Sequence, residues 1–348
     1  MHKASRDGFI NVFVLFVWED KVNSVAGLSE TKHRELFSGT ADRKGISSAI
    51  AEKDFWVSWV LMRLFEHPEL SKKVLFKGGT SLSKAFHLIE RFSEDIDLVL
   101  DWRLLTKDDP KKERSKKQQN IFNKNLRKSA EEYIHGKIMS WVKEAVGDIC
   151  RVEVDKEDMR VLHIHYPGVF EDQYLRADIH LEIGPFSEWV PCAEYFISPY
   201  AAEAFPSVFS TSQCRVVAIK AERTFWEKAV ILHKEAFRAE KQPVPIRYSR
   251  HYYDLAMMAR SNVKADALND FKLLEQVVEF NERFFPRVWA HYELAKPGTM
   301  RLIPPVHFEQ FLRSDYGDMK HMIFGNYPEF DEILNTIKIL EDAINALQ

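Results

Sequence analysis

The feature that most constrains the fold is a pair of aspartates inside an aliphatic run, EDIDLVL, at Glu94 to Leu100. Alternation of this kind is typical of a β-strand, in which successive side chains point to opposite faces. Asp95 and Asp97 would share one face with Val99, and aliphatic side chains would form the other. A carboxylate withdrawn from water is costly unless it is paired or bound to a cation. The run therefore predicts a strand with one face in a core and a functional site on the other.

A glycine turn precedes this strand. KVLF at 73–76 predicts a short strand, and residues 81–91 carry apolar side chains at helical spacing. Glycines between the two elements would let the backbone approach a ligand closely, and a helix N-terminus favours an anion. The sequence therefore predicts a phosphate cradle at Gly78, Gly79 and Thr80.

Two carboxylates at i and i+2 on a strand, with Cβ atoms roughly 6–7 Å apart, suit a shared hard cation. Mg²⁺ is typically bound by one or two carboxylates together with substrate phosphates, so Asp95 and Asp97 are candidate Mg²⁺ ligands. Lys84 and Ser93 are further candidates for contact with a nucleotide; the alternatives are a solvent-exposed lysine and a loop serine. The combination fits phosphoryl or nucleotidyl transfer, in which positioning and charge neutralisation do most of the work.

The bulk composition excludes several classes of protein. The net charge of −3 leaves no global basic field of the kind that marks a nucleic-acid binder. Three widely spaced cysteines form neither a disulfide framework nor a metal-ligand pattern. The apolar run FINVFVLFVW at 9–18 is too short to span a bilayer and predicts a buried helix or strand, so we expect no membrane contact and a cytoplasmic location. A basic run at 111–128 is either an RNA contact or a solvated helix.

The order of elements along the chain predicts an α+β fold, with a small mixed β-sheet, helical flanks and a mostly helical C-terminal domain. Residues 46–66 predict a helix, 160–166 and 175–184 predict strands, and the chain after about residue 213 reads as mostly helical. We expect an N-terminal helical segment at 1–70, a core at 71–212 and a helical domain at 213–348.

Histidines on the two predicted strands suggest a second hypothesis. His163 and His165 alternate on one strand, and Asp178, His180 and Glu182 share a face of the other. Such a set could bind zinc or iron in a phosphodiesterase or other metal-dependent hydrolase. The alternative is that these histidines are hydrogen-bonded residues of the sheet.

Taken together, these motifs resemble a known family. GGT, a helix and DID resemble the first motif of the polymerase-β-like nucleotidyltransferase superfamily, and the longer string KGGTSLSKAF to RFSEDIDL resembles the AbiEii/AbiGii toxin family, which includes the MenT toxins. AERTFWEKAVILH is similar to the family's lysine motif and RYSRHYYDL to its closing motif, which map to Lys228 and Asp254. The resemblance covers about residues 45–345.

The resemblance implies a toxin that moves a nucleotide from an NTP, with Mg²⁺, onto an acceptor, beside a cognate antitoxin. The acceptor would be RNA, in several family members the tRNA 3′ end, or a protein hydroxyl. By the same resemblance, Gly79 and Thr80 contact phosphate and Lys228 neutralises its charge, while Asp254 positions the acceptor or the lysine.

The wider superfamily also uses a third carboxylate on a neighbouring strand. The resemblance maps it to Asp178, with Asp254 as the alternative. A non-catalytic binding module with the same fold is a further alternative, which the presence of both aspartates and the lysine disfavours.

Overall fold

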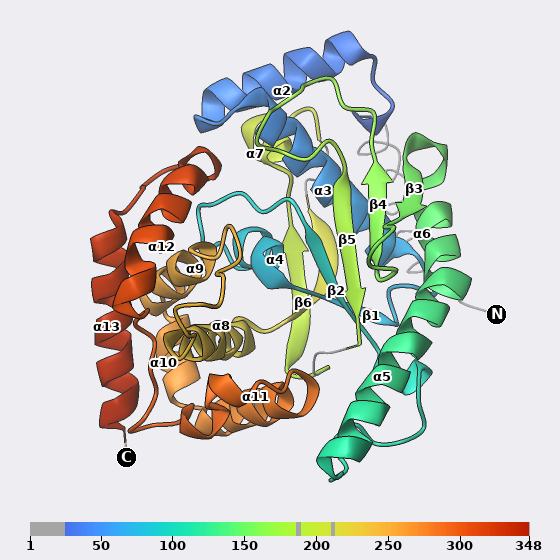
Figure 1. The fold of residues 1–348 in the computed structure, drawn as a ribbon. Coiled ribbons are helices and arrows are strands. Elements are labelled where there is room, and N and C mark those ends of the chain that lie inside the picture. Colours follow the sequence, from blue (N-terminus) through green and yellow to red (C-terminus); the bar gives the residue numbers. More distant parts are fainter. Residues whose placement is uncertain (1–24, 186–188, 210–212, 348) are drawn as a thin grey trace, which may run out of the picture.

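The computed structural model describes residues 25–185, 189–209 and 213–347. Within these ranges the strands form one seven-stranded mixed sheet in the order β3-β4-β5-β2-β1-β7-β6 (Figure 1). Strand β2 runs antiparallel to β1 and parallel to β5, and β1 runs parallel to β7. The strands span Val74–Lys77 (β1), Ile96–Leu100 (β2), Arg151–Val154 (β3), Val161–His165 (β4), Ile179–Gly184 (β5), Cys192–Ile197 (β6) and Cys214–Ile219 (β7).

A first hydrophobic core lies on one face of this sheet. Ile96 and Leu98 of β2 belong to it, which confirms the alternation expected from the sequence. Trp56 and Trp59 of α3 join the same cluster and are no more than 1% exposed. The N-cap of α3 is Ser47, whose hydroxyl accepts a hydrogen bond from the third backbone N–H that follows it.

A second hydrophobic core is built by the helices that follow β7, together with Leu82 and Ile89 from the segment before β2. Figure 1 shows these helices, in gold to red, on one side of the sheet, with α3 and α6 on the other. The predicted α+β class is therefore confirmed. The α-helices in the described ranges span Glu30–Lys44 (α2), Ser48–Glu66 (α3), Gly78–Lys84 (α4), Lys116–Tyr133 (α5), Met139–Val146 (α6), Tyr200–Ala204 (α7), Ala221–Ala236 (α8), Arg250–Ala259 (α9), Val263–Leu268 (α10), Phe271–Phe284 (α11), Val306–Asp318 (α12) and Phe330–Ala346 (α13).

The predicted division at residues 70/71 and 212/213 stays a prediction. Helix α3, from the predicted N-terminal segment, packs in the same core as the sheet. Strand β7, from the predicted C-terminal domain, is part of that sheet. Apart from Leu82 and Ile89, the buried residues of the second hydrophobic core all come from Ala221 onward.

Four elements differ from the sequence-based expectation. The helix expected at 81–91 begins at the glycine turn and ends at Lys84. The segment after it is drawn into tertiary contacts instead: Arg91 pairs with Asp254, and the backbone N–H of Phe92 donates to the carbonyl of Met322 at 2.6 Å. Strands β3, β6 and β7 were also missed, because such short runs cannot be assigned to helix or strand by periodicity alone.

No helix in the described ranges is long and apolar enough to cross a bilayer. The apolar run at 9–18 lies outside the described residues.

Lys84 joins α4 to α3 in the interior. Its ammonium lies 2.7 Å from Oδ1 of Asp54, and the two side chains are 4% and 1% exposed. The second oxygen of Asp54 accepts the backbone N–H of Tyr200 at 2.6 Å. Lys84 is therefore not solvent-exposed but forms a buried ion pair, and its contact with the nucleotide stays a prediction.

We expect Lys84→Met to lower the free energy of unfolding by about 3–5 kcal/mol, because it leaves the Asp54 carboxylate buried without its cation. Urea denaturation measures this. Lys338→Met is the matched control, since Lys338 is 53% exposed beside Glu341 and Asp342, and we expect a change within about 1 kcal/mol. Equal losses in the two variants would contradict a structural role for Lys84.

Candidate active site

The glycine turn and strand β2 are in direct contact. Gly78 adopts φ +82°, and a Cβ atom on it would lie 1.9 Å from Oδ2 of Asp97. A Cβ atom on Gly79 would lie 2.7 Å from Nη2 of Arg91 and 2.9 Å from Oγ of Ser93. Both glycines are thus required by close approach, and the backbone of the turn faces Asp97. Because α4 is only seven residues long, close backbone approach matters here more than a helix dipole.

Thr80 fixes the strand rather than pointing outward. It is 1% exposed. Its hydroxyl lies 3.3 Å from the carbonyl oxygen of Ser93 and makes a shorter contact with that of Asp95. Ser93 therefore lies at the glycine turn, its contact with a nucleotide stays a prediction, and the described contacts of Thr80 are with the backbone that carries Ser93 and Asp95.

Three carboxylates meet on the face of the sheet opposite the first core. In the strand register, Asp97 is the partner of Lys77 on β1 and of Glu182 on β5. Paired residues on neighbouring strands point to the same face, so Glu182 stands beside Asp97, and Asp95 precedes them by one step along the same face. The sequence placed Glu182 only among the histidine-strand ligands; the β2–β5 register, which it does not reveal, brings this residue to the aspartates.

Burial and the proximity of neighbouring carboxylates disfavour the ionised forms of Asp97 and Glu182. Burial, with the nearby charge of Asp95, raises the pKa of Asp97. Desolvation, followed by the charges of Asp97 and Asp95, raises the pKa of Glu182 to about 7. One cation already lies among them: Nη1 of Arg176 is 2.7 Å from Oδ1 of Asp95. The arrangement favours additional positive charge between Asp97 and Glu182.

Lys228 and Asp254 lie together, on α8 and α9. The Lys228 ammonium is 2.7 Å from Oδ2 of Asp254 and 3.1 Å from Nδ1 of His251. Arg91 holds both oxygens of Asp254, at 2.6 and 2.8 Å. Although burial opposes ionisation, Arg91 and Lys228 keep the pKa of Asp254 well below its ordinary value. Burial, and then the charge of Lys228, lowers the pKa of His251, so a neutral imidazole accepts from the lysine.

The positive charge of this cluster reaches the carboxylates. Lys228 and Arg250 both act on Asp97, lowering its pKa against the effect of burial. Lys228 is 7% exposed, and its position is fixed by Asp254 and His251 rather than by solvent. The structure therefore brings together the glycine turn, Asp95, Asp97 and the Lys228–Asp254 pair.

The described contacts of Asp178 are with histidines. Its carboxylate lies 2.5 Å from Nδ1 of His163 and 3.5 Å from Nε2 of His180. The other ring nitrogen of His163 is 2.9 Å from Asp155. Ligand atoms of His163, Asp178 and His180 lie within 4.8 Å of one another, so three of the five residues of the histidine hypothesis converge. His165 pairs with Glu153 instead. The two carboxylates on His163 raise its pKa against the effect of burial, which fits a hydrogen-bonded imidazolium.

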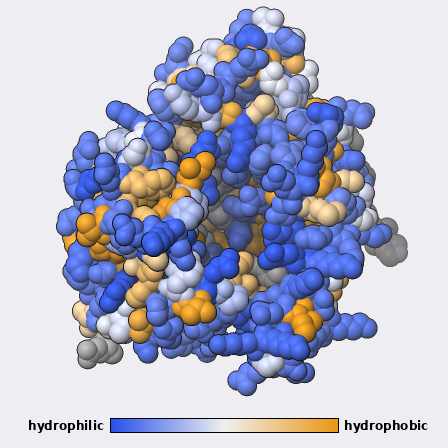
Figure 2. All heavy atoms as spheres, in the orientation of Figure 1, coloured by the Kyte–Doolittle hydropathy of each residue, from blue (hydrophilic) through white to orange (hydrophobic). Residues whose placement is uncertain are grey.

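A cleft of about 200 Å³ opens beside the carboxylates. Its lining includes Lys77, Asp97, Glu182, Gly184 and Phe285. Figure 2 shows hydrophilic side chains gathered around the hollow on this face of the molecule. The described part of the basic run, on α5 and the segment before it, is mostly exposed.

A family model for the AbiEii nucleotidyl transferase toxin, a type IV toxin–antitoxin system, matches residues 59–336. The chain belongs to this AbiEii family. As an AbiEii protein it is a nucleotidyltransferase, which confirms the enzyme class expected from the motifs.

Two solved structures are similar to this AbiEii chain. MenT4, a nucleotidyltransferase toxin of Mycobacterium tuberculosis H37Rv, is 16% identical with a TM-score of 0.42, covering 92% of this chain and 100% of its own. An H. pylori protein assigned to the nucleotidyltransferases is 12% identical with a TM-score of 0.40, covering 87% of this chain and 99% of its own. No curated protein matches the sequence.

The raised pKa of Glu182 predicts a pH-dependent stability in the metal-free AbiEii protein. When a carboxyl has a higher pKa in the folded than in the unfolded state, the free energy of unfolding of the protein falls as pH rises between the two values. For Glu182 these values are about 4.5 and about 7. Glu182→Gln removes this loss. Because solvent screens the charge of this exposed side chain, we expect the free energy of unfolding of Glu182→Gln to exceed that of the wild type by only about 1 kcal/mol. This corresponds to a rise in melting temperature of about 2 °C.

Thermal unfolding in EDTA at pH 8 and pH 5 measures the effect. We expect the variant to melt higher than the wild type at pH 8 and equally at pH 5. Glu153→Gln is the control, because Glu153 lies on β3, paired with Arg151 and His165. A gain of equal size at both pH values would show that Glu182 is not coupled to the aspartates.

Proposed function

We propose that this protein transfers a nucleoside monophosphate from an NTP to an RNA acceptor, the tRNA 3′ end, in a reaction that depends on Mg²⁺ held by Asp95 and Asp97. The observation that carries the proposal is the contact of the glycine turn with Asp97 while Glu182 stands in register on the next strand. This contact places a backbone cradle for phosphates against a set of hard oxygen ligands, the combination that nucleotidyl transfer needs.

The residues present fit a divalent metal. Burial, and then the charges of neighbouring carboxylates, raises the pKa values of Asp97 and Glu182, so a bound cation would stabilise their ionised forms. All the ligands are oxygens, which suits Mg²⁺. When bound, the metal would neutralise phosphate charge and polarise the α-phosphate.

The side chains of the protein then have distinct tasks. The acceptor hydroxyl attacks the α-phosphate in line, and pyrophosphate leaves. Glu182, which stands beside Asp97 in the strand register, is suited to accept the proton of the attacking hydroxyl as a general base. Lys228 supplies positive charge to the phosphates, and Asp254 holds it in place.

The family also implies a biological setting. In a type IV toxin–antitoxin system, the activity would arrest growth and a cognate antitoxin would counteract it. The basic side chains exposed on α5 support an RNA acceptor, since lysines and arginines bind phosphates without reading sequence. A protein hydroxyl as acceptor and an EDTA-sensitive phosphodiesterase at the histidine strands are the alternative outcomes.

A labelling assay tests the proposal. Purified protein, Mg²⁺ and total tRNA are incubated with each of the four α-³²P NTPs in turn. We expect one NTP to label RNA and Asp97→Asn to reduce the label by at least about 100-fold, because the uncharged amide would bind more weakly the metal that stabilises the phosphate charge in the transition state. Asp148→Asn, an exposed carboxylate on another element, should label as the wild type does.

The nature of the product decides between the alternatives. Label that RNase removes supports an RNA acceptor, whereas label that only protease removes replaces RNA with a protein. No label with any NTP, together with phosphodiesterase activity that Asp97→Asn retains, would overturn nucleotidyl transfer at these aspartates.

A further inference from the structure

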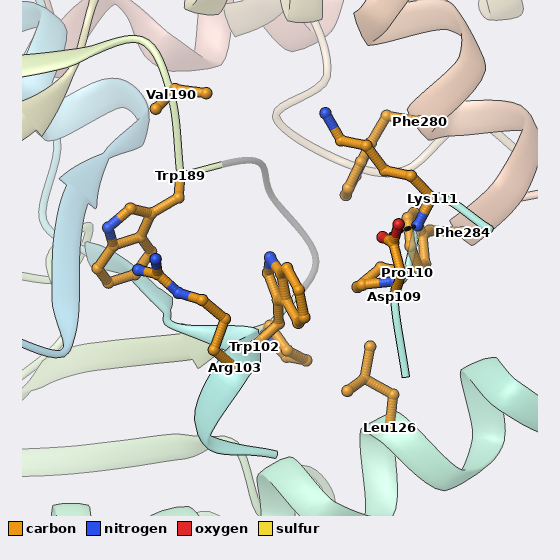
Figure 3. A pocket seen from close by; sticks show the side chains of 11 residues that line it. Trp102, Arg103, Asp109, Pro110, Lys111, Leu126, Trp189, Val190, Phe280 and Phe284 are labelled. Atoms are coloured by element: carbon orange, nitrogen blue, oxygen red, sulfur yellow. Dashed lines mark hydrogen bonds between the residues drawn. The ribbon is translucent and has the colours of Figure 1, made fainter. Parts of the chain in front are cut away.

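A second cavity, of about 260 Å³, lies next to the catalytic cleft and is largely aromatic and apolar (Figure 3). Figure 3 shows Trp102 and Trp189 on one side of it and Phe280, Phe284 and Lys111 on the other. The remaining lining residues are Arg103, Asp109, Pro110, Leu126, Pro185 and Val190. We refer to it as the tryptophan pocket. None of the functional tasks described above uses it.

The tryptophan pocket is on the same face of the sheet as the carboxylates. Val99 is two residues after Asp97 on β2 and so points the same way. Trp189 packs against the small cluster that contains Val99 and Ile219. The pocket thus continues the polar face of β2 beyond its C-terminal end, where Trp102 follows the strand.

The pocket and the catalytic cleft share a border. Gly184 lines the cleft and Pro185 lines the pocket; on α11, Phe284 lines the pocket and Phe285, which follows the helix, lines the cleft. Trp102 is five positions after Asp97, which places their Cα atoms no more than about 18 Å apart. A short single-stranded end whose terminal hydroxyl lies at the aspartates can therefore reach the pocket.

The direction of the reaction assigns the pocket to the acceptor rather than to the donor. In phosphoryl transfer the attacking and leaving oxygens are roughly in line, on opposite sides of the phosphorus. The glycine turn, proposed to hold the leaving phosphates, is at the C-terminal end of β1. Because β2 is antiparallel to β1, Trp102 follows the opposite end of the strand pair. The acceptor must approach from that end.

The chemistry of the walls suits a nucleobase with its phosphate. Every base has a π-face that stacks on aromatic side chains, and such platforms are combined with basic grooves that follow the backbone. The Arg103 guanidinium lies 5.8 Å from the ring centre of Trp189 and its side chain is 59% exposed. Leu126 anchors α5, the helix with the exposed basic side chains, against Phe284 at the pocket.

We propose that the tryptophan pocket binds an unpaired nucleobase of the RNA acceptor by stacking on Trp102 and Trp189, while Arg103 contacts an adjoining phosphate. The inference rests on the proposed function, since it names how that same site selects its acceptor. It assigns the pocket to single-stranded RNA near the reacting end, and it makes base stacking rather than base-edge hydrogen bonding the source of affinity.

A double-mutant cycle tests this inference. The RNA is the acceptor that the wild-type enzyme labels, prepared with a single abasic nucleotide at each unpaired position near its 3′ end in turn. The proteins are wild type, Trp102→Ala, Trp189→Ala and Trp102→Phe. We expect Trp102→Ala to raise the KM for RNA about tenfold, as loss of a stacked base does, with the KM for the NTP unchanged. One abasic position should weaken the wild type equally and Trp102→Ala no further.

Trp102→Phe keeps an aromatic face and should restore most of the affinity. Phe311→Ala, which removes an aromatic side chain that is 38% exposed on α12, is the matched control and should behave as the wild type. Melting temperatures of all variants show whether the fold is kept. Trp189→Ala and Trp102→Ala are scored separately, so misfolding of one leaves the other decisive.

The outcomes separate the two proposals. If the wild type labels RNA but no tryptophan variant changes the KM for RNA, the pocket assignment is wrong and the proposed function stands. A raised KM for the NTP alone would assign the pocket to the donor base and overturn the inference. If the wild type labels no RNA, the proposed function fails first, and the acceptor pocket fails with it.

Discussion

A Cβ atom on Gly78 would lie 1.9 Å from Oδ2 of Asp97, so the turn and strand β2 close on each other only because no side chain stands between them. The rest of the site follows from this contact. It holds the peptide groups of the turn against a carboxylate, and the strand register then adds Lys77 on one side and Glu182 on the other. The proposed phosphate cradle and the proposed metal ligands are therefore positioned relative to each other by backbone geometry.

A second constraint ties the helical part of the chain to that geometry. Arg91, from the segment between α4 and β2, and Lys228 of α8 both bind the fully buried Asp254 of α9. Buried ion pairs add little net stability, because desolvation offsets most of the attraction. Their value here is positional: the same carboxylate fixes the direction of Lys228 and the distance between the C-terminal helices and the strand that carries the aspartates.

The sequence made the aspartate strand, the glycine turn and α3 predictable, because each is a local pattern with its own physical signature. It could not supply Glu182 as the partner of Asp97, since register between distant strands depends on tertiary packing. Lys84 shows a related limit of sequence-based prediction. Helical spacing indicates which face of the helix a lysine lies on, but not that the lysine forms a buried ion pair with Asp54 of a distant helix. Strand β7 and the early end of α4 were missed because neighbours distant in sequence decided both.

The antiparallel pairing of β1 with β2 also explains why the two ends of the site differ. At the end where β1 stops and β2 starts, the chain places the glycine turn, Asp95 and the positive charge of Lys228 and Arg250. At the other end it places the aromatic side chains of the tryptophan pocket, with Arg103 and Asp109 beside them. A transfer reaction has the same asymmetry, since the leaving group is highly charged and the acceptor need not be. One strand pair thus separates a highly charged half-site from an apolar one, and the phosphorus that changes partner would lie between them, over Asp97.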